Sequence, residues 1–171
     1  KKVKVLDIAT GTGRTLQQIQ SALPQVELYG LDLSGSYLKQ ASKYLSSRSG
    51  DLVQLTRGNA EKMPYASDSF QALTCVFLFH ELPRDARQNV LNECFRLLEP
   101  GGTLVLADSI QIEDSPKFTP IMENFHKIFH EPYYRDYIVD NINLRLEESG
   151  FSSITSESHF MTKVWKANKP V

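Results

Sequence analysis

Residues 5–14 read Val5-Leu6-Asp7-Ile8-Ala9-Thr10-Gly11-Thr12-Gly13-Arg14, and this stretch decides the fold. Residues 3–8 form an apolar, β-branched run that predicts a strand, and a helical pattern begins at Thr15. Small residues at positions 9, 11 and 13 leave the backbone between them open to a ligand. Because amides at a helix start carry partial positive charge and suit a carboxylate or phosphate, the unit predicts a cofactor cradle.

Two common phosphate-binding motifs fit this stretch poorly. The dinucleotide fingerprint G-x-G-x-x-G needs a third glycine where the chain has Leu16, and no lysine follows either glycine as in a phosphate-binding loop. The pattern that fits is D-x-A-x-G-x-G, with Asp7 at the strand tip. A second acid, Asp32, closes the next apolar run, residues 26–31. A carboxylate there can accept both hydroxyls of a ribose, and the absence of a nearby arginine argues against a 2′-phosphate.

With these residues the chain resembles the class I S-adenosylmethionine-dependent methyltransferases, and most of all the subgroup of type 11, ubiquinone/menaquinone C-methyltransferase-like enzymes. Two further motifs carry the resemblance in the family's order and spacing: Gly58-Asn59-Ala60-Glu61-Lys62-Met63-Pro64 and Leu98-Glu99-Pro100-Gly101-Gly102. The resemblance covers nearly the whole chain. It implies S-adenosyl-L-methionine as cofactor, S-adenosyl-L-homocysteine as product, and a Rossmann-like methyltransferase fold.

Strand and helix patterns alternate along the chain. Further strands are predicted over residues 52–56, 70–77 and 103–107, Ser34 caps the second helix, and residues 99–102 end the helix before the last of these strands. Such alternation predicts an α/β, doubly wound, mostly parallel sheet. Helical patterns fill residues 120–149 as far as Gly150, and residues 153–157 and 161–165 predict a closing strand pair. The resemblance implies seven strands, the last of them antiparallel.

Composition limits the class of protein. A chain of 171 residues predicts a single domain over residues 1–171, and a net charge of −1 argues against nucleic acid and acidic membranes as partners. No apolar run is long enough to cross a bilayer, and the isolated Cys75 and Cys94 are expected to be reduced core residues. We expect an intracellular protein, cytoplasmic or organellar. Because the chain opens on Lys1-Lys2-Val3, we also expect that N-terminal helices, which cover the active site in this family, are missing.

The cofactor site is expected where loops 9–14, 32–34, 58–61 and 77–81 meet, at the carboxyl ends of the strands. Asp32 has the alternative role of helix cap, and Arg14 either meets the methionine carboxylate or is solvated. In the family an acid stands in place of Asn59 and accepts from the adenine amine; the Asn59 amide oxygen can also accept. Leu33 packs against adenine or belongs to the core. The expected cofactor-binding residues are Asp7, Ala9, Thr10, Gly11, Gly13, Arg14, Asp32, Leu33, Asn59, Ala60, Glu61 and Phe77.

The segment Phe77-Leu78-Phe79-His80-Glu81-Leu82-Pro83 follows the fourth strand and is expected to face the transferred methyl group. His80 and Glu81 are the candidate catalytic pair, although a structural hydrogen bond from His80 to a neighbouring loop is favoured over base catalysis. Residues 118–137 are rich in aromatic side chains and predict a lid suited to a flat or apolar small molecule. The expected substrate-contacting residues are Phe79, His80, Tyr133, Tyr134 and Arg135.

One further cluster has metal-like spacing. Glu123, His126 and His130 recur at intervals of three and four on one predicted helix. At about 100° per residue they turn away from its apolar face, so a solvated face is favoured and no metal is expected.

The sequence therefore predicts direct, in-line methyl transfer to a small molecule. The sulfonium activates its own methyl group, so the protein must mainly position the reactants and exclude water, with a base needed only if the acceptor loses a proton in the step. Two alternatives stay open. One is an NAD(P)-dependent oxidoreductase on a similar sheet, which the missing third glycine disfavours. The other is a domain that binds cofactor or partners without catalysis, which no sequence feature separates from an active enzyme.

Overall fold

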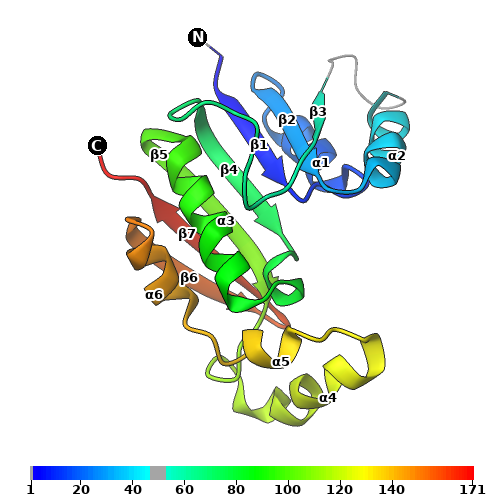
Figure 1. Cartoon of the computed structure of the whole chain (residues 1–171), viewed down its shortest axis with the longest axis vertical. Coiled ribbons are helices and arrows are strands. Elements are labelled where there is room, and N and C mark those ends of the chain that lie inside the picture. Colours follow the sequence, from blue (N-terminus) through cyan, green and yellow to red (C-terminus); the bar gives the residue numbers. More distant parts are fainter. Residues whose placement is uncertain (1, 47–52) are drawn as a thin grey trace.

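The computed structural model describes residues 2–46 and 53–171, which form a seven-stranded sheet in the order β3-β2-β1-β4-β5-β7-β6 (Figure 1). Strands β1 to β5 pair in parallel, β7 pairs antiparallel with β5, and β6 pairs antiparallel with β7. This confirms the predicted doubly wound sheet with one antiparallel strand. The strands are β1 (Lys4–Ile8), β2 (Glu27–Asp32), β3 (Gln54–Arg57), β4 (Phe70–Val76), β5 (Leu98–Ser109), β6 (Ser152–His159) and β7 (Thr162–Asn168).

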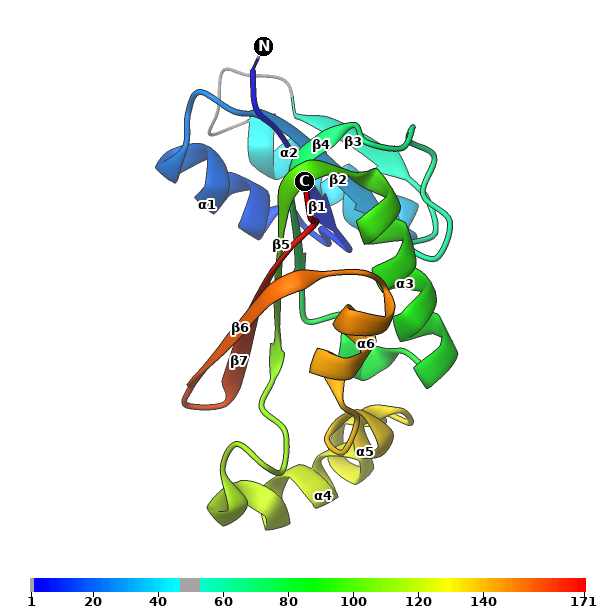
Figure 2. The same ribbon diagram turned by 90° about the vertical axis from the view of Figure 1, so that its left-hand side faces the viewer.

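Helices cover both faces of the sheet (Figure 2). Helices α1 (Arg14–Ala22) and α2 (Gly35–Ser46) share one apolar cluster with β1 and β2, whereas α3 (Arg84–Leu97) and α6 (Ile142–Glu148) pack on the opposite face. Helices α4 (Thr119–Phe129) and α5 (Tyr134–Tyr137) lie beyond the carboxyl ends of the parallel strands. Two one-turn 3₁₀ helices, η1 (Phe79–Glu81) and η2 (Pro116–Phe118), precede α3 and α4. No helix in the two described ranges is both long and apolar enough to cross a membrane.

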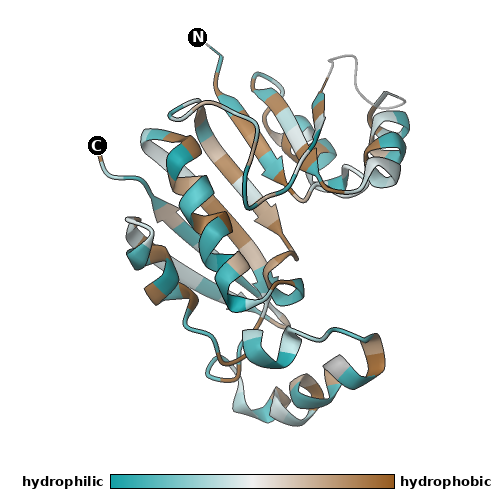
Figure 3. Cartoon of the chain, viewed as in Figure 1, coloured by the Kyte–Doolittle hydropathy of each residue, from teal (hydrophilic) through white to brown (hydrophobic). Residues whose placement is uncertain are grey.

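The core lies between the central strands and α3. Leu73 and Cys75 of β4 and Val90 and Cys94 of α3 are at most 1% exposed and belong to one cluster. Figure 3 shows apolar residues concentrated on the central strands, while α3 carries many polar residues on its outer side. Each fully buried aliphatic side chain contributes about 1.5–3 kcal/mol. Both cysteines are free and buried, as predicted.

Two predicted boundaries are wrong. Strand β5, predicted over residues 103–107, begins at Leu98, because Gly101 N donates to Lys169 O and Lys169 N donates to Gly102 O. This pairing with the end of the chain leaves no local signal in the sequence. The predicted helical stretch 120–149 is divided into α4, α5 and α6, with His130 left-handed at the end of α4. Leu52, predicted to begin the third strand, lies outside the described residues.

The strand order places the switch point of the sheet between β1 and β4. Helix α1 follows β1 on one face, and α3 follows β4 on the other. In sheets of this kind a crevice opens at the carboxyl ends of the two strands at the switch point. The loops after β1, β2, β3 and β4 surround it here.

Candidate functional site

The loop after β1 is joined directly to the end of β2. Gly11 N donates to Asp32 Oδ2 at 2.8 Å, and Ser34 N donates to Asp32 Oδ1 at 2.8 Å. Ala9 and Gly11 adopt left-handed φ values of 56° and 54°, which turn the loop toward the carboxylate. The structure therefore brings together the small-residue loop after β1 and the Asp32 carboxylate, which the sequence analysis expected at one site. A carboxylate offers about four lone-pair positions, so two remain for a ligand.

These residues line a cavity of about 310 Å³, here called the β1–β2 cavity. Of the expected cofactor-binding residues, Ala9, Gly11, Asp32, Leu33, Asn59, Ala60 and Phe77 line it. Its remaining lining residues were not assigned to the cofactor from the sequence. They are Leu31, Tyr37, Gly58, Leu78, Glu81 and Leu82. Tyr37 could have been predicted from the sequence, because it lies one turn after the expected helix cap Ser34. In the structure its amide donates a hydrogen bond to Ser34 Oγ.

The other expected cofactor residues do not line this cavity. Gly13 is buried, and a Cβ there would lie 3.2 Å from Ala41 Cβ, so this glycine lets the start of α1 pack closely against α2. Arg14 is exposed at the start of α1. Glu61 points toward α3, where its carboxylate accepts a hydrogen bond from Asn89 Nδ2 at 2.9 Å. These three residues shape or surround the site without forming its wall.

Asp7 and Thr10 support the loop from beneath. Asp7 is 1% exposed and accepts hydrogen bonds from Thr10 Oγ1 at 2.7 Å and Thr74 Oγ1 at 2.6 Å. Burial raises the pKa of Asp7 from 3.8 to about 6, the bonds from Thr74 and Thr10 act in the opposite direction, and the charge of Asp32 adds to the increase. Asp7 thus ties β1 to β4 below the cavity.

Asp7→Asn is expected to flatten the pH dependence of stability. The pKa of the Asp7 carboxyl is 3.8 in the unfolded chain and about 6 in the folded protein. The wild type therefore loses stability as the pH rises through this range, and the loss persists at higher pH. Between pH 5 and 7.5 this loss amounts to about 1.5 kcal/mol, which the asparagine variant avoids. Urea unfolding at both pH values measures the difference. Parallel pH profiles for the two proteins would contradict the assignment.

A second cavity, of about 420 Å³, opens beside the first and is here called the β4–β5 cavity. Phe77 and Glu81 line both cavities. Phe77 follows β4 with a left-handed φ of 55°, which is uncommon for a bulky residue and marks a strained turn at the junction. The β4–β5 cavity is lined by Phe77, His80, Glu81, Ser109, Phe125, Tyr134, Met161 and Thr162.

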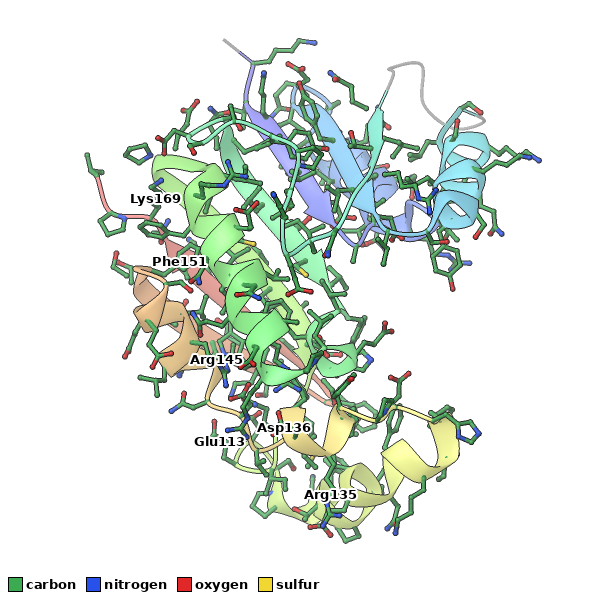
Figure 4. The ribbon with its side chains drawn as sticks, in the orientation of Figure 1. Glu113, Arg135, Asp136, Arg145, Phe151 and Lys169 are labelled. Carbon is green, nitrogen blue, oxygen red and sulfur yellow. The ribbon has the colours of Figure 1, made fainter. Side chains whose placement is uncertain are left out.

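Two of the five expected substrate-contacting residues line the β4–β5 cavity, and the other three do not. His80 and Tyr134 line the β4–β5 cavity. Phe79 does not, because its side chain is 1% exposed and belongs to the core. Tyr133 presents its carbonyl oxygen to Arg87 Nη2, and Arg135 is exposed on α5 near α4 (Figure 4). The structure thus places neither Tyr133 nor Arg135 in the cavity wall.

His80 is held by a buried carboxylate that the sequence analysis missed. His80 Nδ1 lies 2.7 Å from Asp108 Oδ1, and Asp108 also accepts from Phe79 N and Ser109 N. Burial opposes the charged imidazole, but the hydrogen bond and charge of Asp108, with Glu81 and Glu131, outweigh it, so the pKa of His80 is raised. The hydrogen-bond partner of His80 therefore lies on strand β5, whereas the sequence analysis expected it in a neighbouring loop. The sequence feature that could have revealed this partner is the acidic residue Asp108 directly after the predicted strand 103–107.

The predicted helix with metal-like spacing is α4, which contributes Phe125 to the wall of the β4–β5 cavity. Glu123 is exposed on α4, and His130 is exposed at the end of that helix. The side chain of His126 lies outside the described residues. Neither Glu123 nor His130 lines either cavity.

Comparison with known sequences identifies the family. The family described as "Methyltransferase domain" matches residues 5–102. The demethylmenaquinone methyltransferase of Thermotoga maritima is 34% identical over 123 residues, which cover 72% of this chain and 50% of that protein. The enzyme of the same name from Deinococcus radiodurans is 37% identical over 105 residues, covering 61% and 42%. The chain therefore spans about half the length of these relatives.

Solved structures confirm the fold. A putative methyltransferase from Bacillus halodurans superposes with a TM-score of 0.80 at 19% identity, covering 99% of this chain and 94% of that one. Phosphoethanolamine N-methyltransferase 2 of Haemonchus contortus, solved with S-adenosyl-L-methionine, gives 0.76 at 15% identity, covering 100% and 49%. Because the family match spans more than half of the sequence, the chain belongs to the class I S-adenosylmethionine-dependent methyltransferases and is similar to their ubiquinone/menaquinone C-methyltransferase subgroup.

Proposed function

We propose that this chain binds S-adenosyl-L-methionine in the β1–β2 cavity and transfers its methyl group to a small molecule in the β4–β5 cavity. The observation that carries the proposal is the Asp32 carboxylate fixed 2.8 Å from the Gly11 amide, on a cavity that shares Phe77 with a second, largely apolar one. Family membership supports the cofactor. Each cavity then has one occupant, and Phe77 lies between them.

The residues present fit this cofactor. A Cβ built on Gly11 meets nothing within 4 Å, so this backbone faces open space. The lone pairs of Asp32 that the Gly11 and Ser34 amides leave free suit the two ribose hydroxyls. Asn59 Oδ1 accepts from Glu61 N and keeps a second lone pair for the adenine amine, while Leu33, 67% exposed, offers an apolar surface to the base. When bound, S-adenosyl-L-methionine supplies a methyl group already activated by its sulfonium.

In the proposed complex the β4–β5 cavity positions the acceptor and shelters it from water. Phe125 and Tyr134 give it aromatic walls, and Met161 and Thr162 close it from the β6–β7 hairpin. Holding two reactants in line lowers a barrier by up to roughly 7–11 kcal/mol. Among the described residues, those that line it include no lysine or arginine, which favours an uncharged, flat acceptor over a polyanion. The names of the Thermotoga and Deinococcus relatives, demethylmenaquinone methyltransferases, support an aromatic acceptor.

Thermal unfolding with added ligands tests the cofactor. S-adenosyl-L-homocysteine at about 100 times its dissociation constant is expected to stabilise the chain by about 2.7 kcal/mol and to raise Tm by roughly 5–10 °C. NADH at the same concentration is expected to leave Tm unchanged. The reverse pattern would favour an oxidoreductase instead.

Transfer of labelled methyl groups tests the reaction. With labelled S-adenosyl-L-methionine, we expect label in the small-molecule fraction of a cell extract and little in its protein or nucleic acid. Label mainly in a macromolecular fraction would contradict the acceptor class. Binding of S-adenosyl-L-homocysteine without transfer to any fraction would favour a non-catalytic domain.

A further inference from the structure

Three side chains converge around Glu81, a residue that lines both cavities. His80 and Glu81 belong to η1, and Glu131 lies in the loop between α4 and α5. One ligand atom from each lies within 4.8 Å of those of the other two, and His80 Nε2 is 3.9 Å from Glu81 Oε1. An ion can touch all three only if these separations stay within about twice a metal–ligand distance, roughly 4–5 Å for common divalent cations. The cluster meets this condition.

The tautomer of His80 is set by a residue outside the cluster. Asp108 has a fully buried side chain and holds His80 Nδ1 at 2.7 Å, which leaves Nε2 free on the side of Glu81. Histidines that bind metals almost always donate their other ring N–H to a carboxylate or carbonyl in this way. The buried partner therefore prepares His80 as a ligand through Nε2.

The two glutamates of the cluster face His80 and have no lysine or arginine partner among the described residues. Asp108 adds a third acid behind His80. Carboxylates left close together without a cation repel one another. One nitrogen and two oxygen ligands suit a divalent first-row metal such as Zn²⁺ or Mn²⁺.

We propose that His80, Glu81 and Glu131 bind a divalent metal ion at the boundary of the cofactor and acceptor cavities. The ion would attach the α4–α5 segment, through Glu131, to the η1 turn. If the proposed function holds, a metal here can also polarise an oxygen atom of the acceptor, so the preferred acceptor carries a hydroxyl or carbonyl next to the methylated position.

Binding of Zn²⁺ alone tests the site. The tag-free chain, stripped with chelator and dialysed, is titrated with Zn²⁺ by calorimetry, and bound zinc is counted by mass spectrometry, without cofactor or acceptor. We expect one ion per chain. Glu131→Gln and Glu81→Gln are each expected to weaken binding at least about tenfold, and Asp108→Asn about 10- to 100-fold through the orientation of His80.

Glu123→Gln is the matched control, because it removes the same charge from an exposed position on α4. It should bind Zn²⁺ as the wild type does. Circular dichroism checks that each variant folds, and since Glu81 and Glu131 lie in different segments, misfolding of one variant leaves the other to decide. Absence of stoichiometric binding, or wild-type affinity in a folded Glu131→Gln or Glu81→Gln variant, would overturn the metal site. Because the cofactor is absent, failure here is distinct from failure of S-adenosyl-L-homocysteine binding.

Discussion

Asp32→Ala is expected to weaken binding of S-adenosyl-L-homocysteine by at least about 100-fold. In the proposed complex this carboxylate accepts both ribose hydroxyls, and hydrogen bonds to a charged group are worth about 1.5–3 kcal/mol each. The same carboxylate fixes the Gly11 and Ser34 amides at 2.8 Å, so its loss also releases the loop after β1. Isothermal titration calorimetry measures the change.

Two further variants sharpen this test. Asp32→Asn keeps the volume but turns an NH₂ group toward either the Gly11 or the Ser34 amide, so it should not restore affinity. Asp85→Asn removes one charge from an exposed position in the first turn of α3 and should bind as the wild type does. Thermal unfolding of the free proteins separates lost binding from lost folding. A folded Asp32→Ala variant with wild-type affinity would refute the role of this carboxylate.

The position of the β1–β2 cavity was predictable because its signals are local. A strand tip followed by small residues fixes where Gly11 lies, and Asp32 closes the next strand, which pairs with β1 in parallel. The carboxyl ends of neighbouring parallel strands share one edge of a sheet, so alternation alone places these two residues together. Asp7 was assigned to the ligand for the same reason, yet the structure buries it. Sequence spacing does not tell on which side of a strand tip a side chain lies.

The β4–β5 cavity depends on contacts between distant segments, which a single sequence does not reveal. Asp108 reaches His80 across 28 residues, and Met161 and Thr162 close the cavity from the β6–β7 hairpin. Helix α5 is a single turn, too short for a periodic pattern to show that Tyr134 is buried while Tyr133 is exposed. The aromatic composition of residues 118–137 was visible in the sequence, but the orientation of these side chains was not.

Arg87→Met is expected to destabilise the protein by about 3–5 kcal/mol, the usual result of removing one partner from a buried ion pair. The Arg87 side chain is fully buried, and its Nη1 lies 2.8 Å from both Asp136 Oδ2 and Asp140 Oδ2. Its Nε donates to Phe79 O at 2.9 Å. One guanidinium therefore joins α3, the η1 turn and the α5 segment. For a domain of this size the loss corresponds to a fall in Tm of roughly 6–20 °C.

Arg84→Met is the matched control, since Arg84 precedes Arg87 by one turn on α3 and pairs with the same Asp136. Both partners of that pair are substantially exposed, 50% for Arg84 and 41% for Asp136, so its loss should cost no more than about 1 kcal/mol. Figure 4 shows Asp136 on the side of α5 that faces α3. The two variants lose the same charge from the same helix and share the partner Asp136, so they differ in the burial of the arginine and in the further contacts that Arg87 makes. Equal Tm shifts for the two variants would show that the α5 segment does not depend on the Arg87 network for its attachment.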